Sequence, residues 1–259
     1  MRSFNLKGKV AIVTGGNGGI GLGMAHGLAA AGADIAVVGR NEDKSKAAVA
    51  DLAARGVRAI SVATDVTDKE AVGRMVERVR RELGRIDILV NNAGINIRKA
   101  PHALELDEWS SVIDTNLTSA FLCSKAVHPA MKAAGGGKII NIGSMMSIFG
   151  ASFAPAYAAS KGGIVQFTRS CACAWAVDNI QVNAILPGWI DTDLTKRARV
   201  EVNGLHDKVL ARTPAARWGA IDDFAGIAAF LASPASDFVT GQVVVVDGGN
   251  AVAEERATR

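Results

Sequence analysis

Short apolar runs rich in valine, isoleucine and leucine recur along the chain, and longer segments rich in alanine and leucine separate them. The short runs do not alternate between polar and apolar positions, which is typical of strands buried on both faces of a parallel sheet. They predict strands at residues 10–14, 34–38, 59–63, 86–90, 138–142, 181–186 and 243–247. The longer segments predict helices at residues 20–31, 43–55, 69–83, 107–134, 157–177 and 222–231.

This alternation predicts an α/β fold, because parallel neighbours need a crossover helix and right-handed crossovers place helices on both faces of the sheet. We expect a Rossmann-type doubly wound sandwich of three layers, with a seven-stranded parallel sheet in the middle. No repeat, low-complexity segment or linker interrupts the pattern, so a single domain is expected over residues 1–259. Residues 193–215 carry mixed charge, and we expect them to form a loop of the kind that closes over a substrate.

The composition argues against several classes of protein. The chain has 29 basic and 25 acidic residues and a net charge of +4, and the cationic side chains are dispersed, so no nucleic-acid surface is expected. Its three cysteines have no paired spacing, and no set of His, Cys, Asp or Glu has the spacing of a metal site, so neither disulfides nor a metal are expected. The N-terminus lacks a hydrophobic signal and no run is long enough to span a bilayer, which predicts a soluble, cytoplasmic protein without a membrane partner.

A glycine-rich turn follows the first predicted strand. Gly15, Gly19 and Gly21 have the spacing Gly-x-x-x-Gly-x-Gly at the point where this strand passes into the first helix. Glycines let the backbone turn sharply and approach a pyrophosphate, whose charge the helix N-terminus favours. The turn therefore predicts a dinucleotide site, with contacts expected from Gly15, Asn17, Gly18, Gly19 and Ile20.

The end of the second strand indicates which dinucleotide binds. An acidic residue there would accept hydrogen bonds from the adenosine ribose and select NAD, but this chain has Gly39, Arg40 and Asn41. The small Gly39 leaves room and Arg40 can pair with a 2′-phosphate, so NADP is the expected cofactor, with NAD as the alternative. Further cofactor contacts are expected at the ends of the third and fourth strands, from Asp65, Val66, Asn91, Ala93 and Gly94.

Tyr157 and Lys161 lie four residues apart in a predicted helix, and Ser144 lies thirteen residues before the tyrosine. The spacing places the phenol and the ammonium group on one helix face. A free phenol has a pKa of about 10 and transfers protons poorly at neutral pH, whereas a neighbouring cation lowers that pKa. The pair therefore indicates acid–base chemistry at Tyr157.

These motifs resemble, in type and order, those of the short-chain dehydrogenase/reductases over nearly the whole chain. They are the glycine turn, residues 91–94, Asn116, Ser144, Tyr157, Lys161 and the pair Pro187-Gly188. The resemblance implies an NAD(P)-dependent oxidoreductase acting on CH–OH groups, with Tyr157 as general acid and base and Ser144 bound to the substrate oxygen. It also implies that Lys161 binds the nicotinamide ribose and lowers the pKa of the tyrosine, and that Asn116 holds a water of a proton relay. Pro187, Gly188, Ile190 and Thr192 match the segment that contacts the nicotinamide end.

Within this family, residues 155–162, 183–188 and 212–219 are similar to segments of the sugar-acid oxidoreductases, the gluconate 5-dehydrogenases and 2-deoxygluconate dehydrogenases. The resemblance favours a reaction between a secondary alcohol and a ketone on a sugar acid or polyol. A sugar acid needs a cation for its carboxylate, and Arg98 is the candidate, although Arg98 and Lys99 fit a surface pair equally well. The other expected substrate contacts are Ser144, Met145, Tyr157 and Trp189.

Three alternatives stay open. A 3-oxoacyl carrier-protein reductase would dock an acidic carrier on basic side chains beside the pocket, which Arg98, Lys99, Lys196, Arg197 and Arg199 could supply. A glucose or polyol dehydrogenase would need no carboxylate contact. A catalytically silent dinucleotide sensor on the same fold would be expected to lack Tyr157, Lys161 or Ser144, and all three are present. The resemblance also implies a homotetramer with a small molecule as its substrate, in which the helices predicted at 107–134 and 157–177 pack between subunits.

Overall fold

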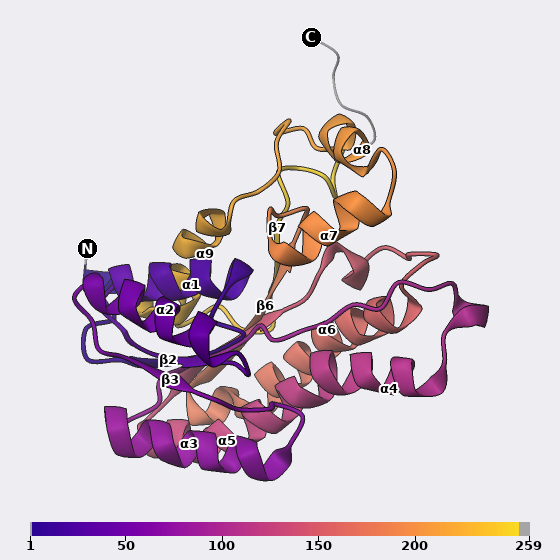
Figure 1. Cartoon of the computed structure of the whole chain (residues 1–259). Coiled ribbons are helices and arrows are strands. Elements are labelled where there is room, and N and C mark those ends of the chain that lie inside the picture. The colour runs from indigo at the N-terminus through magenta and orange to yellow at the C-terminus, as the bar shows by residue number, and fades with distance from the viewer. Residues whose placement is uncertain (1, 254–259) are drawn as a thin grey trace.

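The sheet at the centre of the molecule has seven parallel strands in the order β3-β2-β1-β4-β5-β6-β7 (Figure 1). The computed structural model describes residues 2–253. The strands are β1 (Val10–Thr14), β2 (Asp34–Val38), β3 (Ala59–Val62), β4 (Ile88–Asn91), β5 (Gly137–Ile142), β6 (Ile180–Pro187) and β7 (Val243–Val246). The strand order and the parallel pairing confirm the predicted Rossmann-type fold, and each predicted strand overlaps an observed one.

Helices cover both faces of this sheet (Figure 1). One face carries α1 (Gly19–Ala30), α2 (Glu42–Ala54) and α9 (Ala225–Ala232). The other carries α3 (Lys69–Leu83), α5 (Ser119–Ala133) and α6 (Pro155–Trp175). The result is the predicted sandwich of three layers.

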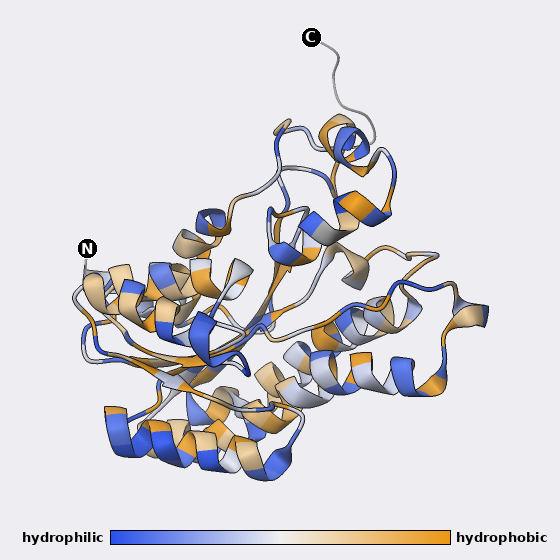
Figure 2. Cartoon of the chain, in the orientation of Figure 1, coloured by the Kyte–Doolittle hydropathy of each residue, from blue (hydrophilic) through white to orange (hydrophobic). Residues whose placement is uncertain are grey.

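Each central strand contributes to two hydrophobic cores. In β1, Ala11 and Val13 pack on the side of α1, whereas Val10 and Ile12 pack on the side of α3 and α5. Neighbouring side chains of a strand point to opposite faces, so a strand covered on both faces needs apolar residues at every position. This explains the unbroken apolar runs of the sequence, which are the orange strands in the middle of Figure 2.

The long helix predicted at residues 107–134 is interrupted. α4 (Leu106–Ile113) passes into the π-helical segment Asp114–Thr118, and α5 follows it. A π-helical turn adds one residue to an α-helix, and such turns are frequent at functional sites. The prediction of one regular helix is therefore wrong in its middle, at the segment that contains Asn116.

Residues 193–215 do not form the predicted loop. They fold largely into α7 (Asp193–Glu201) and α8 (Leu205–Arg212), which project away from the sheet beside the end of β7 (Figure 1). A small apolar cluster holds them, in which Ala198, Leu205 and Val209 pack against Trp189 and Trp218. The helices are not evident in the sequence because only a few of their side chains are buried.

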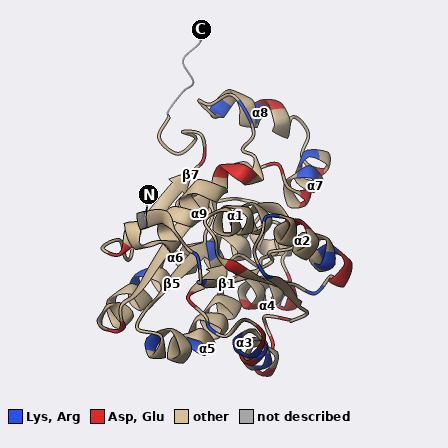
Figure 3. Ribbon diagram, turned by 90° about the vertical axis from the view of Figure 1, so that its left-hand side faces the viewer, with Lys and Arg blue, Asp and Glu red and all other residues tan. Residues whose placement is uncertain are grey.

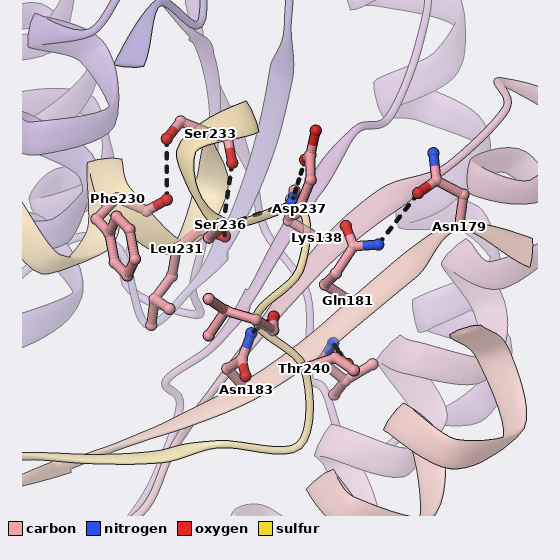
Figure 4. A network of polar contacts seen from close by, with 12 residues as sticks. Lys138, Asn179, Gln181, Asn183, Phe230, Leu231, Ser233, Ser236, Asp237 and Thr240 are labelled. Carbon is pink, nitrogen blue, oxygen red and sulfur yellow. Dashed lines mark hydrogen bonds and ion pairs between the residues drawn. The ribbon is translucent and has the colours of Figure 1, made fainter. Parts of the chain in front are cut away.

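A network of polar contacts fastens the last strand where β5, β6 and β7 begin (Figure 4). Asn183 accepts a hydrogen bond from the backbone of Gln242 at 3.0 Å and donates one to the carbonyl of Val239 at 2.8 Å. Lys138 donates to Asp237 at 2.7 Å. Burial lowers the pKa of Lys138, and the contact with Asp237 opposes this change. The network thus fastens the start of β7 to β6.

Charged side chains of both signs share the outer helices (Figure 3). On α3, for example, Arg78 pairs with Glu82 at 2.8 Å, one helical turn further along. Within residues 2–253, no helix is long and apolar enough to cross a membrane.

Candidate active site

A cleft lies at the carboxyl ends of β1 and β4, which are neighbours in the sheet. The chain continues from β1 to β2 on one side of this pair and from β4 to β5 on the other. Ligands of doubly wound sheets bind at this topological switch point. The cleft consists of two cavities of about 530 and 310 Å³. Both are lined by Gly15, Asn17, Lys44, Ala93 and Gly94.

The glycine turn fits a bound pyrophosphate. Gly15 and Gly19 have φ angles of +63° and +52°, which residues with a side chain rarely adopt. A Cβ on Gly21 would lie 2.4 Å from the carbonyl oxygen of Gly15, so the helix can start this close to the turn only with glycine. A Cβ on Gly18 would meet no atom within 4 Å, so this glycine faces open space at the N-terminus of α1. The turn thus presents bare backbone to the cleft, as an anion site requires.

Thr14 and Asn92 hold the two sides of the switch point together. The hydroxyl of Thr14 accepts hydrogen bonds from the backbone N–H groups of Asn92 and Ala93, at 2.9 and 3.1 Å. The side chain of Asn92 donates to the carbonyls of Thr14 and Gly15, at 3.0 and 3.2 Å. These bonds position the glycine turn against the end of β4. Asn92 belongs to the predicted motif of residues 91–94 and lines the smaller cavity, but its contacts with the glycine turn were not foreseen from the sequence.

The larger cavity brings together the residues expected on the adenosine side: Arg40, Asn41, Asp65 and Val66. The side chain of Arg40 is 72% exposed and lies 3.8 Å from Asp65. The pKa of Asp65 is lowered, chiefly by the hydrogen bonds that it accepts from the backbone and side chain of Thr67. Asn41 caps α2 by accepting a hydrogen bond from the backbone of Lys44. Lys44, which no sequence motif indicated, lines both cavities.

Gly39 lines the larger cavity beside Arg40, and its lack of a side chain also permits a packing contact. A Cβ at this position would lie 2.6 Å from the amide nitrogen of Asn17. That amide donates to the carbonyl of Asn41 at 3.3 Å and to the hydroxyl of Ser45 at 3.0 Å. The glycine therefore allows the side chain of Asn17 to contact the start of α2, and room for a phosphate at Gly39 stays a prediction.

Asn91 does not line the cofactor cleft, contrary to the prediction. Its side chain is buried and donates to Asn141 at 2.8 Å and to Ser124 at 3.0 Å. As the last residue of β4, it points between the sheet and α5, and the next residues face the cleft. Asn91 thus links β4 to β5 in the core.

The smaller cavity brings Ser144 together with the remaining predicted cofactor contacts. It is lined by Gly18, Gly19, Ile20, Ser144, Tyr157, Lys161, Pro187, Gly188, Ile190 and Thr192. Ser144 follows the end of β5, Tyr157 and Lys161 lie on α6, and Pro187 ends β6. α6 is helical through both residues, so the predicted placement of the phenol and the ammonium group one turn apart is confirmed.

The protonation of Tyr157 is determined by opposing influences. Burial raises the pKa of the phenol, and this effect is the largest. A hydrogen bond with Ser144 and the positive charge of Arg98 lower the pKa, but the net shift is upward. The influence of Arg98 was not foreseen from the sequence.

Lys161 is buried beside the tyrosine. Its ammonium group donates to the carbonyl of Ile142 at 2.7 Å and lies 5.6 Å from the centroid of the Tyr157 ring. Burial lowers the pKa of Lys161 to about 8. The lowering of the tyrosine pKa by Lys161, which the resemblance implies, stays a prediction.

Asn116 lies in the π-helical segment and is 2% exposed. Its amide accepts from the backbone N–H of Ile95 at 2.8 Å and donates to the carbonyl of Ile95 at 2.9 Å. It also donates to Ser160 at 3.1 Å, on the helix of Tyr157. The side chain therefore joins the loop after β4 to α6, and the water relay stays a prediction.

A third cavity, of about 110 Å³, opens beside the phenol. Its wall includes Asn96, Arg98, Ser144, Met145, Tyr157 and Trp189. It thus brings together all the predicted substrate contacts, with Asn96 as an addition. Arg98 is not a surface residue: its side chain is 19% exposed and donates to Glu201, at the end of α7, at 2.8 Å.

Three of the five cations of the predicted basic patch have acidic partners, whereas Lys196 is exposed. Lys99 pairs with Glu108 at 2.6 Å, Arg199 lies 3.2 Å from Asp191, and Arg98 is paired with Glu201. Arg199 also stacks on the ring of Trp218, at 3.7 Å from its centroid. These three cations do not form the open surface that an acidic carrier would need; the side chain of Arg197 lies outside the part of the chain that the structure describes.

Known proteins have the same architecture. A family model described as "Enoyl-(Acyl carrier protein) reductase" matches residues 15–251. A 2-dehydro-3-deoxy-D-gluconate 5-dehydrogenase of Formosa agariphila is 45% identical over 247 residues, which are 95% of this chain and 94% of the relative. The crystal structure of a gluconate 5-dehydrogenase from Burkholderia cenocepacia, in complex with NADP and tartrate, has a TM-score of 0.92 at 41% identity, covering 97% of this chain and 98% of its own. That of a short-chain type dehydrogenase/reductase from Mycobacterium marinum has a TM-score of 0.92 at 35% identity, covering 97% of this chain and 98% of its own. The chain therefore belongs to the short-chain dehydrogenase/reductase family of oxidoreductases.

Proposed function

We propose that this oxidoreductase interconverts a secondary alcohol and a ketone on a sugar acid, in the manner of a gluconate 5-dehydrogenase, with NADP as its cofactor. The observation that carries the proposal is the position of Arg98, which lines the same small cavity as the hydroxyl groups of Ser144 and Tyr157. One small molecule can therefore place its carboxylate at the guanidinium and its reacting oxygen at the two hydroxyls. The names of the relatives from Formosa agariphila and Burkholderia cenocepacia, both sugar-acid 5-dehydrogenases, support this substrate class.

The residues of the cleft fit a dinucleotide. The glycine turn would bind the pyrophosphate, Arg40 the 2′-phosphate and Lys161 the nicotinamide ribose. Pro187, Gly188, Ile190 and Thr192 line the smaller cavity and would contact the nicotinamide. The bound cofactor supplies the hydride chemistry. The preference for NADP is supported by the complex of the Burkholderia relative with NADP and by the cation at Arg40.

Tyr157 moves the proton of the reaction. Ser144 and Tyr157 together hydrogen-bond the reacting oxygen and hold it in place. In reduction, the phenol of Tyr157 donates its proton to the ketone oxygen; in oxidation, the phenolate accepts the proton of the alcohol. Because burial raises the pKa of Tyr157, the phenol is protonated at neutral pH and suited to the reductive direction.

A homotetramer is part of the proposal. α4 and α5 both expose large apolar side chains, with Leu106 78% and Phe121 46% exposed. Exposed apolar surface of this kind is typical of subunit contacts. Light scattering of the wild type and of Phe121→Glu tests it: four subunits that dissociate in the variant are the expected result, and a wild-type monomer would contradict it.

The substrate class is tested by following the absorbance of NADPH with a panel of ketones. The panel contains 5-keto-gluconate, a keto-deoxy sugar acid, a neutral keto-hexose and a 3-oxoacyl thioester, each repeated with NADH. Selective turnover of the keto acids with NADPH is expected, and Tyr157→Phe should abolish it while NADPH still binds. Preference for the thioester would favour a carrier-protein reductase, and preference for the neutral sugar a polyol dehydrogenase.

Arg40→Asp tests the cofactor assignment. The variant should use NADPH less well and still use NADH, and an unchanged preference for NADPH would contradict the assignment.

A further inference from the structure

The wall of the substrate cavity carries a polar group that the proposed reaction does not use. Asn96 lines this cavity beside Arg98, Ser144 and Tyr157. Its Oδ1 atom is buried and has no hydrogen-bond partner within residues 2–253. A buried amide oxygen without a partner is unfavourable, and native proteins contain few of them. The position of this one, on a cavity, suggests that its partner belongs to the ligand.

The loop that carries Asn96 is anchored on both sides. The residue before it, Ile95, is held through both its backbone N–H and its carbonyl by the amide of Asn116. Two residues after it, Arg98 is held by Glu201. Asn116 also binds Ser160, whose hydroxyl donates to the carbonyl of Tyr157. The loop is thus tied to the helix of the catalytic tyrosine, and the backbone of Asn96 has little freedom to move away from the cavity.

Other polar side chains of this wall already have partners or a role in the reaction. The hydroxyl of Thr195 donates to the carbonyl of Ile190 and accepts from the backbone of Thr192. Ser144 accepts from the backbone of Met146 at 3.2 Å and is assigned to the reacting oxygen. Among the side chains of this wall, Asn96 is the one with a buried oxygen that has no partner within the described residues, and it is therefore the candidate to recognise the middle of a substrate.

We propose that Asn96 binds one hydroxyl group of the substrate, on a carbon between the carboxylate and the reacting carbon, and so makes the enzyme prefer a fully hydroxylated sugar acid to a deoxy analogue. The inference rests on the proposed function. A substrate hydroxyl donates to the buried Oδ1, and an analogue without that hydroxyl leaves the oxygen buried and unpaired. Sites built to bind a hydroxyl reject analogues that lack it far more strongly than apolar pockets reject a missing methylene.

The proposal separates two substrates that the relatives' names suggest. One relative is named for 2-dehydro-3-deoxy-D-gluconate, which has no hydroxyl at C3, and another is a gluconate 5-dehydrogenase. If Asn96 binds the hydroxyl at C3, this chain should have the activity of a gluconate 5-dehydrogenase. If Asn96 binds the hydroxyl at C2 or C4, other residues determine which of the two substrates is used, but the substrate still needs that hydroxyl.

The test measures kcat/KM for the oxidation of D-gluconate and of its 2-deoxy, 3-deoxy and 4-deoxy analogues with NADP. We expect the wild type to use one analogue about 10- to 100-fold less well than gluconate. Asn96→Leu, which has a similar size and no acceptor, should reduce this ratio to less than about 3-fold. Asn96→Asp keeps an acceptor and should keep the ratio, even if its charge beside Arg98 raises KM for every acid. Thermal unfolding checks that the variants fold, and the leucine should not lower Tm because it removes an unpaired buried oxygen.

Two results would overturn the proposal. If the ratio of kcat/KM between gluconate and the deoxy analogue is unchanged in Asn96→Leu, the residue does not bind a hydroxyl. If kcat/KM falls equally for gluconate and all its analogues, the residue has a structural role. Failure of the proposed function looks different: the wild type would then turn over a neutral polyol or a thioester and none of the acids, which would remove the basis of the inference as well.

Discussion

Replacement of Arg98 by methionine should reveal two effects of one positive charge. Methionine keeps an unbranched apolar stem but removes the charge and all the N–H donors of the guanidinium. The side chain of Arg98 is only 19% exposed, so solvent screens its charge poorly and the charge acts on what the cavity contains. We expect kcat/KM to fall for carboxylated substrates and to change little for a neutral polyol.

The size of this loss follows from the kind of contact. A hydrogen bond to a charged group contributes about 1.5–3 kcal/mol, which corresponds to about 10- to 150-fold in kcat/KM. The fold should tolerate the change. Glu201, the partner of Arg98, is 53% exposed and can be hydrated when the guanidinium is absent. Ion pairs of this kind contribute about 0–1 kcal/mol, so Tm should fall by less than about 4 °C.

The second effect concerns the pH dependence. The charge of Arg98 lowers the pKa of Tyr157, so its removal should raise that pKa. Oxidation of an alcohol requires the phenolate, and the rising limb of the profile of kcat/KM against pH should therefore move to higher pH. A neutral polyol is the substrate for this measurement, because it makes no carboxylate contact with Arg98.

Lys99→Met is the matched control. Lys99 is the next residue, is 41% exposed and pairs with Glu108 at 2.6 Å, but it does not line the cavity. Steady-state kinetics of both variants on gluconate and on a neutral polyol complete the experiment. Equal losses on the two substrates in Arg98→Met would refute the carboxylate contact, and an unmoved pH profile would refute the electrostatic link to Tyr157.

Three further predictions follow from contacts elsewhere. Burial lowers the pKa of Lys161 to about 8, so below about pH 8 its buried charge destabilises the folded state. This cost disappears as the pH rises from about 8 toward about 10.4, the ordinary pKa of lysine in the unfolded chain. Lys161→Met should therefore exceed the wild type in Tm most below about pH 8, and a gap that does not narrow at alkaline pH would contradict the assignment. In Gly39→Ala the new Cβ would lie 2.6 Å from the amide of Asn17, which should weaken NADPH binding about 10-fold in fluorescence titrations; Gly73→Ala, with no atom within 4 Å, should leave binding unchanged. Asp237→Asn removes the counter-ion of Lys138, whose side chain is 10% exposed, and should cost about 1–3 kcal/mol in urea unfolding, part of which Lys138→Met in the same chain restores.

The fold could be predicted because the determining pattern is continuous along the chain. Every position of β1 is buried, and its first four residues are accordingly apolar. Tyr157 and Lys161 lie on a regular helix whose period is known in advance. Site residues next to regular elements, such as Ser144 after β5 and Pro187 at the end of β6, were therefore found. α7 and α8 were missed because a few contacts, such as Trp189 with Trp218 at 5.7 Å between ring centroids, determine them. Those partners come from separate parts of the chain.

The errors within the site have a common cause: local sequence does not show which way a side chain points. Asn91 and Asn92 are identical and adjacent, yet the first contacts Asn141 in the core and the second holds the glycine turn. Likewise, nothing near Gly39 in the sequence indicates that the side chain of Asn17 packs against it. Asn96 has no motif around it, and its unpaired oxygen becomes evident only when the whole wall of the cavity is known.

α7 connects the two halves of the site, and the magnitudes of its contacts indicate what positions it. Its first residue, Asp193, pairs with Lys44 at 2.9 Å on the cofactor side, and its last residue, Glu201, pairs with Arg98 on the substrate side. Both carboxylates are more than half exposed, and such pairs contribute about 0–1 kcal/mol each. Burial of one side chain such as that of Val209 in the cluster under the helix contributes about 1.5–3 kcal/mol. The apolar cluster therefore positions α7, while the two ion pairs can be exchanged at little cost when a phosphate or a carboxylate enters the cleft beside Lys44 or Arg98.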